Sequence, residues 1–301
     1  MANIKELKMR IESIAETRKI TNAMYLISTT KLRRAKSELE KTRPYFSALR
    51  SEIKRIFRIN SNIESKYFFP PDNDETAGTR AYLVITSDKG LVGAYNQNVI
   101  KEVNRELEAH PNSKFFVVGD YGRHYFSSHH IQFDEEFNYS AEDPTLALAR
   151  EIAFRLLDAL NSGEVSEIYI IFNDFERGAS VVQNTRILPF HRADFASHED
   201  EKEVNKPFEF MPSIEVVLES MMPSYVTGFV YSTLVDSYCC EQNSRRVAME
   251  SANNNSDEML EEIRHQYNYT RQKMITQEII EIVSGAKYQQ SNKNKEGTKN
   301  G

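Results

Sequence analysis

The first sixty residues carry an apolar repeat that constrains the fold of the whole chain. Alternating steps of three and four residues from Ile4 to Ile56 meet sixteen positions, of which twelve are apolar. At the hydrophobic content of the whole chain, 40%, about six apolar residues would be expected among sixteen positions. A period of this kind is typical of a coiled-coil helix. The apolar positions are Ile4, Leu7, Ile11, Ile14, Tyr25, Leu32, Ala35, Leu39, Phe46, Leu49, Ile53 and Ile56. Arg18, Thr21 and Ser28 make the predicted seam polar in places.

A helix over residues 1–60 is too long to be hidden inside a compact chain. Pro44 is its weak point, since proline disrupts a helix interior, but a helix that ends at Arg43 would still measure roughly 60 Å at about 1.5 Å per residue. A compact chain of 301 residues has a radius of gyration of about 19 Å. The helix must therefore protrude and needs a partner along its apolar side.

The C-terminal part of the chain predicts that partner. Apolar residues recur at helical spacing over 208–287, which predicts a second long helix. Residues 1–60 hold fifteen Lys and Arg against six Asp and Glu, whereas residues 208–290 hold six against twelve. Opposite charge favours pairing. We expect a long antiparallel coiled coil of the two terminal helices, followed by a disordered polar tail over 288–301.

The segment over 78–192 follows a different pattern. The runs "AYLVIT", "KFFVVG" and "EIYIIF" predict short buried strands, and helical stretches are expected at about 95–109 and 144–161. A further strand is predicted at "SVVQNTRILPF". Strands that alternate with helices indicate an α/β fold with a largely parallel sheet. The predicted fold class is therefore α/β, with a central Rossmann-like domain between the two terminal helices.

Composition narrows the function classes. The net charge of −6 argues against a general nucleic-acid binder, and the basic cluster Lys31, Arg33, Arg34 and Lys36 is more typical of a solvated face or an acidic protein partner. No apolar run approaches the roughly 18 residues of a membrane span, and no secretory signal begins the chain. The adjacent Cys239 and Cys240 are badly placed for a disulfide. We expect a soluble, cytoplasmic protein in a reducing compartment.

The run "SDKGLVGAYN" at 87–96 is the one candidate phosphate loop. Gly90 and Gly93 follow a predicted strand, where backbone N–H groups could bind an anion. Their spacing matches neither a P-loop nor a dinucleotide fingerprint. A tight turn that needs glycine freedom is the alternative interpretation, with Asp88 supplying turn chemistry.

One cluster combines histidines with carboxylates: His124, His129, His130, Asp134, Glu135 and Glu136. Its spacing fits no zinc motif, so we favour a solvated helix end with its loop over a metal site. No G-x-S-x-G motif is present. The sequence therefore predicts no catalytic residue, no cofactor-binding residue and no metal ligand.

Four segments together resemble the γ subunit of F-type ATP synthases. They are "MANIKELKMRIESIAETRKITNAMYLISTTKLRRA", "YLVITSDKGLVGAYN", "LVDSYCCEQNSRRVAMESANNNSDEM" and "YTRQKMITQEIIEIVSGA". The resemblance implies a non-catalytic rotor whose terminal helices form a shaft inside a ring of α and β subunits. Ion-driven rotation of this shaft would then change the affinity of the β sites in sequence. The glycine run resembles a turn of the family's central domain, which implies a turn at Asp88, Gly90 and Gly93.

The resemblance also assigns contacts residue by residue. It implies β-subunit contacts at Met24, Arg33, Arg34, Arg271, Gln272, Thr276 and Glu278. It implies a foot on the c ring formed by Phe208, Glu209 and Phe210, beside Met211, which stands where the family has Glu. The implied partners are the α, β and ε subunits and the c ring. No cofactor and no nucleic acid are implied, and partner subunits would hold the chain at the cytoplasmic face of a bacterial cell membrane.

Two alternatives stay open. One is a small α/β nucleotide-binding protein whose coiled-coil arms dimerise it. It predicts that the isolated chain binds a nucleotide through Gly90 and Gly93. The other is the same rotor in a specialised F-type-like ATPase.

Overall fold

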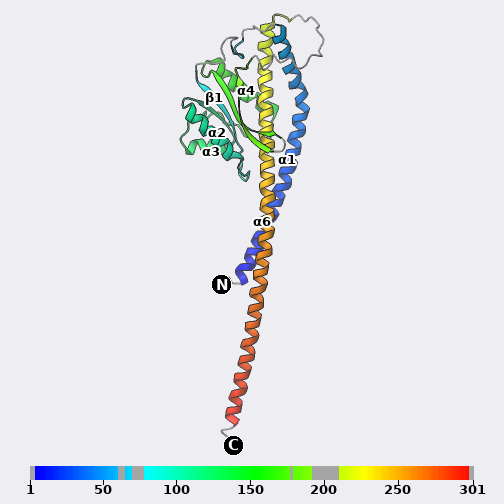
Figure 1. The fold of residues 1–301 in the computed structure, drawn as a ribbon, viewed down its shortest axis with the longest axis vertical. Coiled ribbons are helices and arrows are strands. Elements are labelled where there is room, and N and C mark those ends of the chain that lie inside the picture. Colours follow the sequence, from blue (N-terminus) through cyan, green and yellow to red (C-terminus); the bar gives the residue numbers. More distant parts are fainter. Residues whose placement is uncertain (1–3, 60–64, 70–77, 177–178, 192–209, 298–301) are drawn as a thin grey trace. The chain divides into compact units, whose positions relative to one another are not determined.

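The computed structural model describes residues 4–59, 65–69, 78–176, 179–191 and 210–297. Two compact units divide the chain: a terminal unit of residues 1–25 and 249–301, and a central unit of residues 26–248. Two long helices, α1 (Ile4–Ile59) and α6 (Ile214–Gly297), contribute residues to both units (Figure 1). Each unit is described by itself below.

The central unit contains a four-stranded sheet in the order β2-β1-β3-β4. Strand β1 (Arg80–Ile85) lies parallel to β2 (Lys114–Val118) and to β3 (Glu167–Glu176). Strand β4 (Ala179–Leu188) lies antiparallel to β3 at the edge. The prediction of an α/β fold with a largely parallel sheet is confirmed.

Alternating side chains of β1 separate two apolar layers, as the period of a strand requires. Tyr82 and Val84 pack with α2 (Tyr95–Ala109) and α3 (Asp120–Ser128) on one face. Leu83 and Ile85 join a larger core on the other face, with α4 (Leu146–Asn161) and the central-unit parts of α1 and α6. The sheet therefore rests on the long helices (Figure 1).

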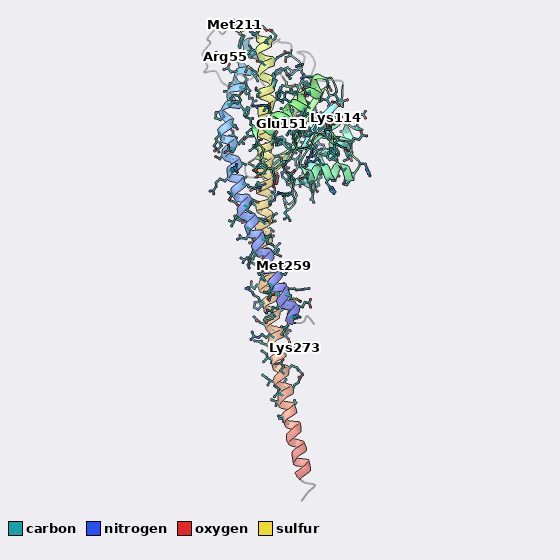
Figure 2. The ribbon with its side chains drawn as sticks, turned by 180° about the vertical axis from the view of Figure 1, so that it is seen from behind. Arg55, Lys114, Glu151, Met211, Met259 and Lys273 are labelled. Carbon is teal, nitrogen blue, oxygen red and sulfur yellow. The ribbon has the colours of Figure 1, made fainter. Side chains whose placement is uncertain are left out.

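The two long helices run antiparallel in each unit. In the central unit, Phe46 faces Tyr231 with ring centroids 6.4 Å apart, and the helices bury Ile53, Ile56, Leu218, Met222 and Val226 in the shared core. In the terminal unit, Arg18 Nε lies 2.8 Å from Asp257 Oδ1. The predicted coiled coil is confirmed, including a polar seam position at Arg18. Figure 2 shows the side chains along the pair.

The predicted first helix continues through Pro44, which lies inside α1. The structure differs from the sequence prediction in two elements. Helix α3 was not predicted, because nine residues that include Gly122 carry no clear period. Helix α6 continues to Gly297 instead of giving way to a disordered tail at 288. Lys, Gln and Glu are common in this last stretch and cost little in a helix.

Gly228 allows α1 and α6 to approach closely, which yields a stability prediction. A Cβ atom at Gly228 would collide with the ring of Phe46. We expect Gly228→Ala to lower the melting temperature in circular dichroism, because overpacking costs about 1–3 kcal/mol and exceeds the gain of about 1 kcal/mol from helix propensity. Gly285→Ala is the matched control, since no atom lies within 4 Å of its added Cβ. Equal melting temperatures for the two variants would contradict this account.

Candidate functional site at the joint between the sheet and the long helices

The loop from Ser87 to Ala94 connects β1 to α2 and forms the centre of the candidate site. The backbone N–H of Ser87 donates to Asn96 Oδ1 at 3.0 Å, and Asn96 Nδ2 donates to Ser87 Oγ at 2.7 Å. Leu91 and Gly93 adopt left-handed φ angles of 62° and 57°. These bonds hold the loop in a compact turn at the carboxyl end of β1.

Arg245 of α6 binds this loop through its backbone. Its Nη2 donates to the carbonyl oxygens of Lys89 and Gly90, each at 3.2 Å. Its Nη1 lies 2.7 Å from Glu241 Oε1, and the two side chains are only 10% and 2% exposed. A buried contact between Arg245 and Glu241 on α6 therefore orients the guanidinium that binds two carbonyl groups of the loop.

Asp88 holds the other side of the same loop. Its Oδ1 accepts from the backbone N–H of Asp120 at 3.0 Å. Its Oδ2 accepts from the N–H groups of Ala141 and Glu142 at 3.0 and 3.1 Å, and from Ser140 Oγ. Carboxylates bind backbone N–H groups strongly. The side chain thus ties the ends of β1 and β2 to the segment at 140–142.

Two lysines share one carboxylate next to Asp88. Lys89 Nζ lies 2.9 Å from Glu142 Oε1, and Lys31 Nζ of α1 lies 3.6 Å from the same oxygen. The hydrogen bond from Lys89 holds the pKa of Glu142 below its usual value. The loop is therefore linked to α1 as well as to α6.

The loop at 87–94 forms a joint between the sheet and the long helices, together with Arg245, Glu241, Glu142 and Lys31. This joint lies where open α/β sheets bind ligands. In such sheets the crevice lies beyond the carboxyl ends of the strands, where the strand order reverses. Here β2 and β3 lie on opposite sides of β1, so the reversal falls at β1. Tyr95 Oη, at the start of α2, lies 2.7 Å from Ser237 Oγ of α6, and Cys240 packs against Val92 and Tyr95. Side chains of α6 therefore contact the edge at which other open α/β sheets bind ligands.

Burial raises the pKa of two carboxyl groups on this part of α6. Burial raises the pKa of Glu241 to about 7, although Arg245 opposes the shift. Burial also raises the pKa of Asp236 to about 6, and the nearby charge of Asp174 adds to the effect. Both acids bind a proton more readily in the folded chain than in the unfolded chain.

The residues assigned by resemblance to subunit contacts fall in both units. Arg33 and Arg34 are exposed on α1, and Met24 is half-buried there. The C-terminal group is exposed on α6: Arg271, Gln272, Thr276 and Glu278. Phe208 and Glu209 lie outside the described residues. Phe210 packs at the edge of the larger core, and Met211 is 84% exposed.

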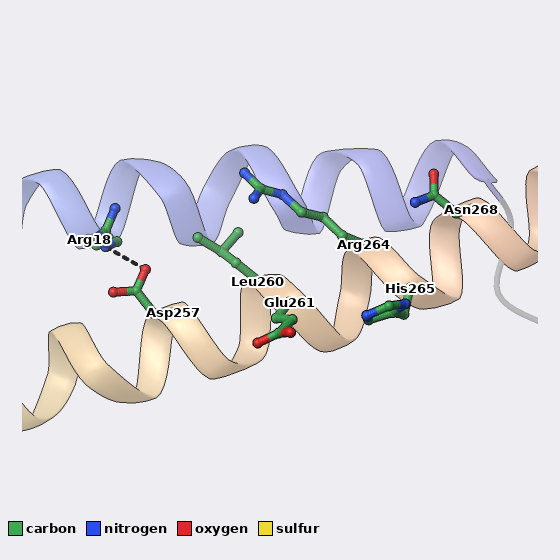
Figure 3. A pocket seen from close by; sticks show the side chains of 7 residues that line it. All are labelled: Arg18, Asp257, Leu260, Glu261, Arg264, His265 and Asn268. Carbon is green, nitrogen blue, oxygen red and sulfur yellow. Dashed lines mark ion pairs between the residues drawn. The ribbon is translucent and has the colours of Figure 1, made fainter.

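The terminal unit has a polar groove between its two helices. It has a volume of about 430 Å³ and is shown in Figure 3. The ion pair of Arg18 with Asp257 stands at one end, and Arg264, His265 and Asn268 follow along α6. Because cationic and acidic side chains both line it, the groove has no strong preference for either charge.

Sequence reasoning missed Glu241 and Arg245. An acid followed by an arginine four residues later is an ordinary pattern on a solvated helix. The only local sign that the pair is buried was the apolar run that precedes it, Tyr238, Cys239 and Cys240. The histidine cluster lies on α3 and in the turn after it, where His124, His129 and His130 are exposed. In the part of the chain that the structure describes, no three His, Cys, Asp or Glu residues are arranged to hold a metal ion.

The fold and these contacts define a class of protein: an α/β domain fastened at the carboxyl edge of its sheet to an antiparallel pair of long helices. None of the described helices is long and apolar enough to cross a membrane. The family model described as ATP synthase matches residues 3–287.

Relatives and solved structures agree with this class. The ATP synthase gamma chain of Caldanaerobacter subterraneus is 38% identical, over 94% of this chain and 98% of that protein. The sodium ion specific gamma chain of Acetobacterium woodii is 34% identical, over 94% and 98%. A chain of the Euglena gracilis mitochondrial ATP synthase, in a structure of OSCP/F1/c-ring, has the same fold, with a TM-score of 0.66 at 17% identity over 96% and 95%. The chain belongs to the ATP synthase gamma chain family.

The raised pKa of Glu241 predicts a pH dependence of stability. The folded chain keeps this proton up to about pH 7, whereas an ordinary glutamate releases it near 4.5. Its contribution to stability is therefore present below pH 4.5 and is lost as the pH rises through 7. We expect the free energy of unfolding of the wild type to fall more steeply between pH 4.5 and 8 than that of Glu241→Gln, measured by denaturant titration. Parallel curves would show that Glu241 does not titrate in this range.

Proposed function

We propose that this chain is the central rotor shaft of an F-type ATP synthase. It couples ion-driven rotation to ATP synthesis and hydrolysis in the β subunits and catalyses no reaction itself. Membership of the gamma chain family supports this role, as does the fold that it shares with a Tetrahymena thermophila "central stalk/cring" chain at a TM-score of 0.58, 24% identity and 77% and 99% coverage. A catalytic site changes population only through contacts that differ between states. An asymmetric shaft supplies such contacts.

One observation carries the proposal: the last part of α6 exposes apolar side chains. All residues from 271 to 287 are exposed. Ile275, Ile279 and Ile282 are 45%, 55% and 72% exposed. Large exposed apolar surfaces usually mark an interaction site. A surrounding ring of α and β subunits would cover this stretch.

The other contacts follow from the same role. Arg33 and Arg34 place positive charge on α1, which attracts an acidic segment of a β subunit. Such charges at the rim of an interface affect the rate and specificity of association more than the affinity. Met24 contacts β on the same helix. Phe208, Glu209 and Phe210 meet the c ring, and the ε subunit completes the rotor. The chain reaches the cytoplasmic face of the membrane only through these partners.

Affinity capture tests the proposed function. The chain would carry a tag in the exposed turn after α3 and be captured from its own cells, followed by mass spectrometry and an ATPase assay. We expect α and β ATPase subunits at about three copies each per captured chain, with ATPase activity. Capture of the chain alone or as a homodimer would overturn the proposal, and calorimetry with ATP would then test the nucleotide-binding alternative.

A double substitution tests the proposed β contact on α6. We expect Arg271→Ala with Gln272→Ala to reduce coupled ATP turnover of the assembled complex several-fold. Folding should change little, because exposed substitutions usually shift stability by less than about 0.5 kcal/mol. Glu262→Ala with Gln266→Ala is the control: these two residues of α6 lie before the exposed apolar stretch and bond to each other at 3.2 Å. Equal turnover in both double variants would exclude the contact.

A further inference from the structure

We propose that Arg245 is a positioning residue that fastens the central domain to the shaft, so that torque passes between them under load without slip. The inference rests on the proposed function. It concerns contacts within this chain, between the β1–α2 loop and the two long helices.

The first support is the directional nature of the contact. Apolar packing between the sheet and the long helices is non-directional, so it resists separation better than sliding. Hydrogen bonds weaken steeply when their angle is lost. Arg245 donates to the carbonyl oxygens of Lys89 and Gly90, which belong to the backbone and cannot rotate away as a side chain can.

The second support is a second polar contact further along the same helix. Ser237 Oγ lies 2.7 Å from Tyr95 Oη, where α2 begins. Eight residues separate Ser237 from Arg245, which is roughly 12 Å along a helix. The separation of the two bonded points along the helix axis resists tilting of the domain against α6, and the second bond adds to the resistance of the first against rotation about α6.

The third support is the stiffness of the loop that Arg245 holds. Asp88 accepts hydrogen bonds from Asp120, Ser140, Ala141 and Glu142, so the loop moves as one body with the end of β2. Through Glu142, the ion pairs of Lys89 and Lys31 reach α1. A force on the domain is therefore shared between both helices.

The chemistry of arginine suits this position. A planar guanidinium can bind a carboxylate on one side and backbone oxygens on another, whereas an ammonium is a compact point charge. Glu241 occupies Nη1 at 2.7 Å and thereby orients the group that reaches the loop. Arg245→Lys would retain the charge beside Glu241 but lose the simultaneous bonds to both carbonyl groups.

The test uses the whole complex in sealed liposomes, with ATP added and a potential-sensitive dye as the probe. This readout serves whether the coupling ion is a proton or sodium. Complexes with wild-type chain, Arg245→Lys or Arg245→Ala would be compared at equal amounts of assembled enzyme. The measured quantities are the ATPase rate and the limiting membrane potential at which net pumping stops. Arg105→Ala is the matched control, because Arg105 of α2 is exposed and its Nη1 donates to Glu102 on its own helix.

We expect Arg245→Lys and Arg245→Ala to lower the limiting potential at least twofold while the ATPase rate stays within twofold of the wild type. We expect Arg105→Ala to match the wild type. A loss of folded enzyme alone would lower pumping and hydrolysis in proportion, and that result would overturn the proposal. An unchanged limiting potential would overturn it too. If Arg245→Ala fails to assemble, Arg245→Lys decides. A wild-type complex that does not pump contradicts the proposed function instead.

Discussion

The antiparallel pairing of α1 with α6 is the constraint on which the rest of the central unit depends. A helix gains most of its stability in a protein by packing an apolar face rather than from propensity. The central-unit part of α1 buries Ile53 and Ile56, and α6 buries Leu218 and Met222 in the same core. The sheet and α4 complete that core. Without the helix pair, α4 alone would be left to cover this face of the sheet.

The polar contacts between the loop and α6 give the carboxyl edge of this sheet a different role from the one that it has in other open α/β sheets. Open sheets commonly bind ligands beyond the carboxyl ends of their strands. Here α6 brings Ser237, Glu241 and Arg245 to that edge, and the glycine loop offers carbonyl oxygens to a guanidinium. An edge that could hold a nucleotide holds a helix of the same chain instead. This arrangement suits a chain whose proposed task is mechanical.

Local patterns explain which features were predictable from the sequence. The period of α1 and the strands of the central domain depend on neighbouring residues, so they could be predicted. Arg245 and Glu241 could not, because their burial depends on a loop 156 residues away from Arg245. The extension of α6 to Gly297 was not predicted because its mostly polar residues show no apolar period. The assigned contacts at Arg271 and Gln272 came from resemblance, and they stay predictions.

Direct observation of rotation tests the central claim. Cys239 and Cys240 are buried, so a single cysteine introduced by Ser127→Cys, at an exposed position of α3, would carry a bead. The α and β subunits of the captured complex would be fixed to a surface and ATP added. The account predicts sustained rotation of the bead in one direction that stops when ATP is removed. Random rotational diffusion of the bead during active ATP hydrolysis would contradict it.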